Sequence, residues 1–232
     1  MKIAGETHEV YEQIYNMIER GEFQYEAKIN QIKLSQQLGV SRTPVIKALH
    51  MLSVEGFLDQ KTNSGFYLHK ITLKEILDLL LARAALEATA AYDIAENADE
   101  ETLFQITEAF DSFQLLNWTN TQEEKNRFLE LDRRCHKLLL ESCNNTYINR
   151  MNDVMKVIEH PYALGMMRDV EQVHEEHNQI ISAIKVRDAF GAQTATANHI
   201  LNTRSSLMNT ARKIEGMGMD ISTLWLQLKT DK

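Results

Sequence analysis

The sequence predicts a mainly α-helical protein in two parts, an N-terminal winged helix-turn-helix followed by an antiparallel bundle of six helices. Three observations support this prediction. A helix–glycine–helix pattern occupies residues 34–56, a short hairpin pattern follows in residues 57–68, and glycine and proline almost vanish between Thr72 and Gly216. Because glycine and proline are poor helix formers, their near absence favours long helices in the second part.

The segment LSQQLGVSRTPVIKALHMLSVEGFL carries the helix-turn-helix signal. Leu34 and Leu38 lie one turn apart, and Gly39 is expected to end the first helix. Ser41 is expected to cap the second helix with its hydroxyl. Pro44 falls in the first turn, where proline has no intrahelical hydrogen bond to lose. The expected buried stripe of this helix, and the glycine that ends it, are Val45, Ala48, Leu49, Leu52 and Gly56.

A β-hairpin wing is predicted directly after the second helix. Two short apolar-rich runs, 57–61 and 66–68, flank the turn Thr62-Asn63-Ser64-Gly65. Asparagine, serine and glycine favour tight turns, and Gly65 can adopt a positive φ. Such a wing can reach the minor groove or the phosphates of DNA, while the outer face of the second helix presents side chains to the major groove.

Residues 7–70 resemble the DNA-binding domain of the GntR family of bacterial transcription regulators. The resemblance rests on LGVSRTPV (38–45), on the Ala48-Leu49-Leu52 pattern and on Glu55-Gly56-Phe57. The family usually carries DNA-contacting arginines where this chain has Ile32 and Ile46, so the resemblance leaves the operator sequence open. The outer face of the second helix, the wing and the lysine beside Ile32 supply the candidate DNA-binding residues, which are Lys33, Arg42, Thr43, Lys47, Asn63 and Gly65.

The net charge of −8 is distributed unevenly along the chain. Residues 1–70 contain eight basic and eight acidic side chains, whereas residues 71–232 contain 17 basic and 25 acidic ones. Within residues 27–70 six basic side chains face two acidic ones, which suits modest phosphate contacts. The N-terminus lacks the apolar core of a signal peptide, and no apolar run approaches the roughly 20 residues of a membrane span. A cytoplasmic protein without a membrane partner is therefore expected.

Apolar residues recur at helical spacing through the second part of the chain. Thr72 is expected to cap its first helix through a capping box with Glu75. The expected domains are residues 1–71 and 72–215. A tail, residues 216–232, carries Trp225 among several leucines and is expected to pack back or to dock on another subunit. The predicted helices span residues 73–96, 99–117, 121–143, 145–163, 168–187 and 188–214.

Four side chains of the bundle form a candidate metal site. Asp132 and His136 lie at i and i+4 and therefore share one helix face. His177 and His199 are 22 residues apart, which lets two antiparallel helices bring both imidazoles to one level. One carboxylate and three imidazoles suit a divalent transition metal such as Zn, Ni or Mn. His174, one turn before His177, is a competing ligand, and solvated histidines without a metal are the alternative.

Residues 73–213 resemble the FCD domain, the helical effector-binding module of FadR-type GntR regulators. Many such domains combine a D-x3-H pair with the histidine of an EH-x-x-I motif and a histidine 22 residues later. Asp132, His136, His177 and His199 match all four positions. The family segment R-x-x-LE implies that Arg83 lies near the effector cavity, although Arg83 and Glu87 also suit a simple i, i+4 salt bridge. Asn178 and Asn202 are further candidates for lining the cavity.

The sequence thus indicates a homodimeric transcription regulator, expected to be a repressor, whose operator binding is switched by a small organic acid at the metal. Two alternatives remain open. The metal can be purely structural, tying three helices together, or the Asp/His centre can belong to a metal-dependent enzyme. The only general base near the predicted ligands is Glu176, which is expected to point elsewhere if His177 points inward.

Overall fold

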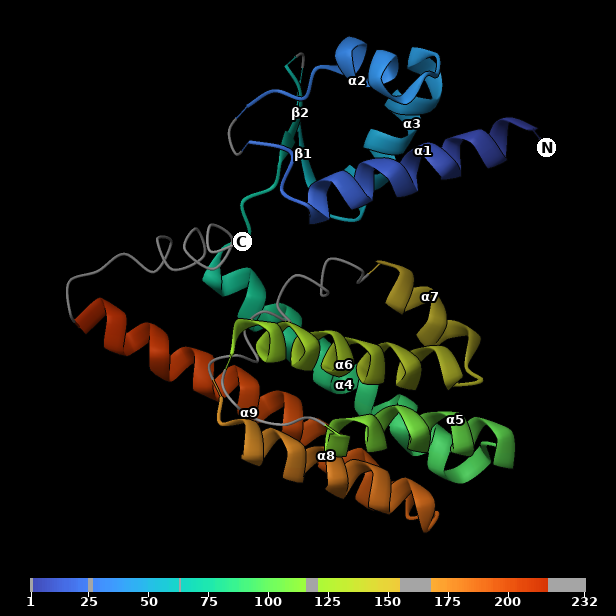
Figure 1. The fold of residues 1–232 in the computed structure, drawn as a ribbon, viewed down its shortest axis with the longest axis vertical. Coiled ribbons are helices and arrows are strands. Elements are labelled where there is room, and N and C mark those ends of the chain that lie inside the picture. The colour runs from blue at the N-terminus through green and yellow to red at the C-terminus, as the bar shows by residue number, and fades with distance from the viewer. Residues whose placement is uncertain (1, 25–26, 63, 116–120, 155–167, 217–232) are drawn as a thin grey trace. The chain divides into compact units, whose positions relative to one another are not determined.

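The computed structural model divides the chain into two compact units, one ending at Ile71 and the other beginning at Thr72. The mainly α-helical class predicted from the sequence is confirmed (Figure 1). Among the described residues, none of the helices combines the length and the apolar character needed to cross a membrane. The structure describes residues 2–24, 27–62, 64–115, 121–154 and 168–216.

The first unit is a winged helix-turn-helix, as predicted. Its two strands are antiparallel, with Leu58 opposite Leu68 at the base and Lys61 opposite Gly65 at the tip. The glycine at the tip has φ +113°, a backbone conformation that L side chains rarely adopt. The elements of this unit are α1 (Lys2–Glu19), α2 (Gln31–Leu38), α3 (Arg42–Val54), β1 (Leu58–Lys61) and β2 (Gly65–Leu68).

Helix α1 was not among the elements predicted from the sequence. It packs against α3, the second helix of the helix-turn-helix. Its buried side chains recur at i, i+4 and i+7, the spacing of one helix face, so the signal for this helix is present in the sequence. The apolar side chains that α1 buries are Val10, Tyr11, Ile14, Met17 and Ile18.

The two helices of the motif begin in different ways. Gly39 ends α2 in the left-handed conformation with φ 68°, as predicted. Asn30 caps α2 through its side-chain oxygen, which accepts the N–H groups of Ile32 at 3.1 Å and Lys33 at 3.0 Å. Ser41 occupies the N-cap position of α3, but its side chain makes no capping hydrogen bond, so that part of the prediction is wrong. The third residue of α3 is Pro44, which has no N–H to donate to the serine hydroxyl.

This difference predicts unequal effects of two alanine substitutions. Asn30→Ala leaves two N–H groups of α2 without their acceptor and is expected to lower the free energy of unfolding by about 1 kcal/mol. Ser41→Ala removes no capping hydrogen bond and is expected to lower the free energy of unfolding by only a few tenths of the loss expected for Asn30→Ala. Urea denaturation of the two variants and the parent protein measures both values. Equal losses would contradict this account of the two caps.

The described part of the second unit has a helix at the place of each of the six predicted ones, with differences at their ends. The helix expected over 99–117 ends as an α-helix at Asp111 and continues as a 3-10 turn, and residues 116–120 lie outside the described part. In this turn Phe113 enters the core, with its ring 5.5 Å from that of Phe128. The elements are α4 (Leu73–Asn97), α5 (Glu100–Asp111), η1 (Ser112–Leu115), α6 (Gln122–Ser142), α7 (Thr146–Val154), α8 (Val170–Lys185) and α9 (Ala189–Gly216).

Two other predictions fall partly outside the described residues. The helix expected over 145–163 is described only as α7, and the tail beyond residue 216 is not described. Helix α8 begins two residues later than predicted, because Asp169 acts as its N-cap and accepts the N–H groups of its first turn. The Thr72–Glu75 capping box at the start of α4 is present as predicted.

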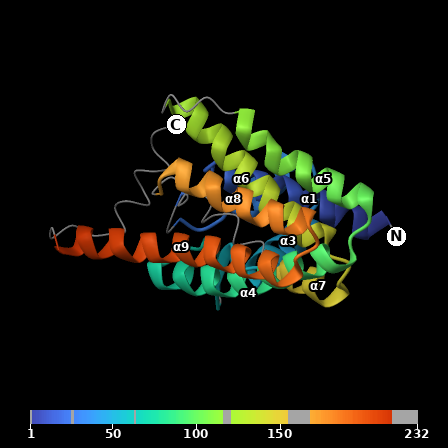
Figure 2. The ribbon, with the colours of Figure 1, turned by 90° about the horizontal axis from the view of Figure 1, so that it is seen from below.

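Four helices surround the polar interior of the second unit. Helices α4 and α9 run side by side along their length, and α8 packs against α9 (Figure 2). Helix α6 contacts α4, and α5 contacts both α6 and α8. One apolar core joins these helices, with Ile94, Ile106, Leu139 and Ile180 among its buried side chains. This packing brings side chains from α4, α6, α8 and α9 together in the interior.

Candidate metal centre

Four buried side chains converge in the interior of the second unit. Helix α6 contributes Asp132 and His136, α8 contributes His177, and α9 contributes His199. Each side chain offers one ligand atom, and these atoms all lie within 4.8 Å of one another. All four residues are buried, and His136 is fully inaccessible to solvent. The structure therefore brings together the four residues that the sequence predicts as a metal site, here called the cluster.

The atoms that face the centre of the cluster are the Nε2 atoms of the histidines and one aspartate oxygen. The Nε2 atoms of His136 and His199 are 3.0 Å apart. Asp132 Oδ1 lies 3.3 Å from Nε2 of His177 and 3.6 Å from Nε2 of His136. An N3O donor set of this kind suits a borderline transition-metal ion better than calcium or magnesium, which prefer oxygen.

Two of the imidazoles are held from behind by carboxylates. Nδ1 of His136 forms a hydrogen bond with Glu87 of α4. Nδ1 of His199 lies 2.8 Å from Oε2 of Glu176 on α8. An ionised carboxylate can only accept a hydrogen bond, so each imidazole donates its Nδ1–H group. Carboxylates hold metal-binding histidines in this way because the bond fixes the ring and leaves Nε2 as the ligand atom.

One short contact between two imidazoles crosses the centre of the cluster. Burial opposes ionisation of His136, yet the carboxylates of Glu87 and Asp132 raise its pKa. Without a metal this imidazole therefore also carries a proton on Nε2 and donates it to Nε2 of neutral His199 at 3.0 Å, and a metal would take the place of that proton. Among the described residues, Nδ1 of buried His177 has no hydrogen-bond partner, and its Nε2 has only the long contact of 3.3 Å with Asp132 Oδ1. Buried polar atoms are rarely left unpaired, and a bound cation satisfies all three Nε2 atoms together. The residues present therefore fit a metal ion.

The electrostatics of the cluster suit the same role. Burial raises the pKa of Asp132, but the charge interactions and hydrogen bonds with His136 and His177 together outweigh burial, and the pKa lies well below its usual value. Burial also opposes ionisation of Glu176, yet hydrogen bonds, the largest from His199, lower its pKa to about 2. Burial, together with the adjacent His177, lowers the pKa of His199 to about 3. At neutral pH Asp132 is therefore ionised and His199 neutral, the forms that bind a divalent cation, and Glu176 is ionised and accepts the Nδ1–H of His199.

The residues predicted to bind an effector lie at different distances from the cluster. Arg83 is buried on α4 and its Nε pairs with Glu87, so it contacts the cluster through the carboxylate that holds His136. Asn202 donates from Nδ2 to Oε1 of Glu176 at 2.8 Å. Asn178 lies half-buried beside the cluster's α8 histidine. His174, the competing ligand, is not one of the four residues of the cluster.

Two predictions about carboxylates need correction. Glu176 was expected to point away from the site, but its carboxylate reaches α9 and binds His199. The side chain is long enough to cross between the packed helices α8 and α9, although it lies next to His177 on α8. Glu87 was interpreted only as a partner of Arg83, whereas it also holds the ring of His136. Neither contact has a local signal, because each joins two different helices.

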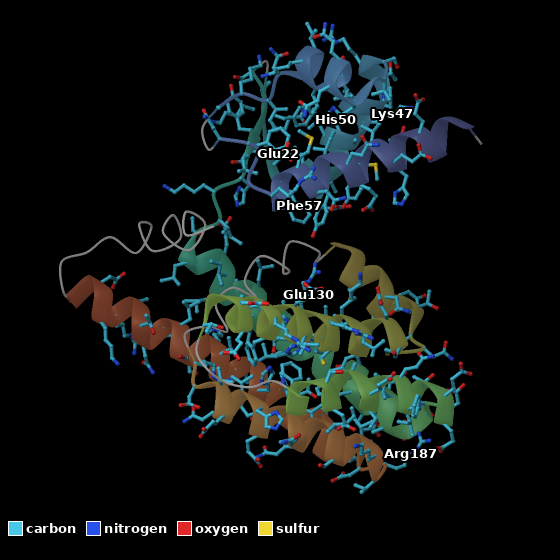
Figure 3. The ribbon with its side chains drawn as sticks, in the orientation of Figure 1. Glu22, Lys47, His50, Phe57, Glu130 and Arg187 are labelled. Atoms are coloured by element: carbon cyan, nitrogen blue, oxygen red, sulfur yellow. The ribbon has the colours of Figure 1, made fainter. Side chains whose placement is uncertain are left out.

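The predicted DNA-binding side chains lie on the first unit. Lys33 on α2, and Arg42, Thr43 and Lys47 on α3, are exposed (Figure 3 labels Lys47). Asn63 lies outside the described residues. Gly65 lies at the tip of the wing, where an added Cβ would meet the Lys28 side chain at 2.8 Å. His50 is also exposed on α3, and its ring packs edge-on against Phe66 of the wing with the ring centroids 5.0 Å apart.

A winged helix-turn-helix followed by a helical domain with a buried polar centre defines a DNA-binding transcription regulator with a separate sensory domain. Comparison with known proteins agrees with this class. The family described as bacterial regulatory proteins, gntR family, matches residues 6–68, and the FCD domain matches residues 78–202. The chain therefore belongs to the GntR family and carries an FCD domain. Regulators of this family bind operator DNA, typically dimerise and bind small-molecule effectors, and FCD domains often bind metal.

Individual relatives are similar along most of the chain. The regulator YdhC of Bacillus subtilis is 26% identical over 194 residues, which cover 82% of this chain and 84% of that protein. The repressor GlaR of Escherichia coli is 24% identical over 203 residues, covering 82% and 90%. The solved structure of E. coli McbR/YncC has a TM-score of 0.67 at 18% identity and covers 88% of this chain and 98% of that one. YdhC is described as a transcriptional regulator and GlaR as a transcriptional repressor.

Proposed function

We propose that this regulator represses transcription as a homodimer and releases its operator when a small organic acid binds a divalent transition metal held by the cluster. The observation that carries the proposal is the set of buried Nε2 atoms and one aspartate oxygen that face a common centre inside the FCD domain. A dimer places two recognition helices on a palindromic operator. Arg42, Thr43 and Lys47 are the proposed DNA contacts on α3.

The charges around the cluster support an anionic effector. The described charged groups that form or hold it are three carboxylates and two guanidiniums, which sum to one negative charge when the imidazoles are neutral. A divalent cation changes this sum to one positive charge. Because an unbalanced buried charge is unfavourable, a carboxylate that joins the metal neutralises the site. These groups are Glu87, Asp132, Glu176, Arg83 and Arg168.

The four protein ligands leave room for such a carboxylate. Nickel and manganese commonly take six ligands, of which one carboxylate and three imidazoles supply four. The bound metal would supply Lewis acidity and open positions for a carboxylate oxygen. Arg83 lies behind the cluster on α4 and can pair with a second oxygen of the acid through the N–H groups at the edge of its planar guanidinium. Switching then follows if the acid prefers one of two helix arrangements that space the DNA-binding units differently.

Thermal unfolding of the metal-loaded protein in a panel of small organic acids tests this proposal. An acid at 100 times its Kd is expected to stabilise the loaded protein by about 2.7 kcal/mol, and to have no such effect after removal of the metal. The variant Arg83→Met is expected to lose most of the response, whereas Arg133→Met, at an exposed ion pair with Glu130 on α6, is expected to keep it. If no acid stabilises the loaded protein, the metal is structural.

A further inference from the structure

Arg168 lies immediately before Asp169, the N-cap of α8, and its side chain is only 5% exposed. Its guanidinium binds both carboxylate oxygens of Glu176, with Nη1 2.7 Å from Oε2. The same Nη1 lies 3.2 Å from Oγ1 of Thr203 and 3.4 Å from the carbonyl oxygen of His199, both on α9. Arg168 therefore joins the start of α8 to the segment of α9 that carries a cluster histidine.

The carboxylate that Arg168 binds, that of Glu176, also forms the hydrogen bond that holds His199. Oε2 of Glu176 accepts from His199 Nδ1 at 2.8 Å, and Oε1 accepts from Asn202 at 2.8 Å. A planar guanidinium bound to both oxygens fixes the plane of a carboxylate, which a single hydrogen bond does not. The orientation of His199 is thus set by a carboxylate whose own orientation is set by Arg168.

His136, a second histidine of the cluster, is supported by a similar pair of side chains. Arg83 binds Glu87, and Glu87 holds Nδ1 of His136. Two arginine–glutamate–histidine chains therefore approach the centre from different helices. The first arginine lies within α4, whereas Arg168 precedes α8 and reaches across to α9. In each chain the arginine compensates the charge of a carboxylate withdrawn from solvent.

We propose that Arg168 is a positioning residue for the metal, which fixes Glu176 on His199 so that Nε2 of His199 remains aimed at the ion. This inference rests on the proposed metal site. A purely structural ion pair between α8 and α9 would stabilise the fold without acting through Glu176. A positioning role predicts that variants of Arg168 bind metal more weakly, whereas a structural ion pair does not. A positioning role also predicts that the effects of changing Arg168 and Glu176 on metal affinity are not additive.

Co²⁺ binding to the purified full-length protein, measured by competition with a chelator and by the visible d–d spectrum, tests the inference. Glu176→Gln and Arg168→Met are each expected to weaken Co²⁺ binding by about 10- to 100-fold, as partners of metal-bound histidines do. The double variant is expected to have about the same Co²⁺ affinity as the single variant that binds Co²⁺ less tightly, because both changes act through His199. Arg133→Met removes the same charge from an exposed ion pair and is expected to bind Co²⁺ as the parent does.

Arg168→Lys provides a second readout if the methionine variant does not fold. It keeps the charge but loses the planar fork, and it is expected to bind Co²⁺ with intermediate affinity and an altered d–d spectrum. If Arg168→Met or Arg168→Lys binds Co²⁺ with the parent's affinity and spectrum, the role of Arg168 is overturned and the proposed metal site is not. The inference would also be overturned if the fold-losses in Co²⁺ affinity caused by Arg168→Met and Glu176→Gln multiply in the double variant. A parent protein that binds no Co²⁺ would overturn the proposed metal site together with this inference.

Discussion

Replacing His177 by alanine is expected to abolish tight metal binding and the stabilisation that the metal provides. His177 is buried, and among the described residues its Nε2 contacts Asp132 Oδ1 at 3.3 Å while its Nδ1 has no hydrogen-bond partner. Its loss leaves the metal with three protein ligands and a cavity beside Phe110 and Phe113, whose rings contact the imidazole. A metal at 100 times its Kd stabilises the parent by about 2.7 kcal/mol, and the variant is expected to lose this whole amount. Thermal unfolding with and without metal measures it.

His174→Ala is the matched control for that experiment. It removes the same ring from the same helix, one turn earlier, at a residue outside the cluster. This variant is expected to keep the metal-dependent rise in Tm. A His177→Ala protein that still gains stability from metal, or a His174→Ala protein that loses it, would contradict the ligand set.

Replacing Arg42 by alanine is expected to weaken operator binding by about 5- to 150-fold, which corresponds to roughly 1–3 kcal/mol. Arg42 is exposed at the first position of the recognition helix, where side chains meet base edges. If Arg42 reads a guanine, the loss is confined to operators that carry this base. If it binds phosphate, the affinity for all DNA sequences falls alike, and the slope of log affinity against log salt concentration becomes shallower by about one. Fluorescence anisotropy at several salt concentrations separates the two roles.

Arg20→Ala controls for the change in charge. Arg20 lies in the same unit, follows α1 rather than standing on the recognition helix, and forms an exposed ion pair with Glu22. Its loss is expected to change operator affinity little. Comparable weakening by both substitutions would show that the effect of Arg42 is a general effect of charge and not a contact of the recognition helix.

The helix-turn-helix could be predicted from the sequence because its signals are local. Gly39 ends α2 and Gly65 closes the wing through backbone conformations that these residues favour. The capping prediction for Ser41 failed for an equally local reason, since Pro44 removes the N–H group that the hydroxyl would accept. Local chemistry therefore determines these elements, including the detail that was predicted wrongly.

The candidate site could likewise be predicted only where its signals are local in the sequence. Asp132 and His136 share a helix face by their spacing, so their proximity follows from the sequence. The support behind the ligands could not be predicted, because it depends on how helices pack. Glu87 meets a histidine 49 residues away, and Glu176 meets one 23 residues away. Only the packing of α4 against α6, and of α8 against α9, brings these groups together.

Binding of the purified regulator to DNA from upstream of its own gene tests the central claim most directly. It is measured with metal, with metal and a stabilising acid, and after chelation, at two salt concentrations. The account predicts tight, sequence-selective and salt-sensitive binding by the metal-loaded protein, which weakens when the acid is added and changes when the metal is removed. Selective DNA binding that is identical in all three states would contradict the claim that the cluster switches this regulator.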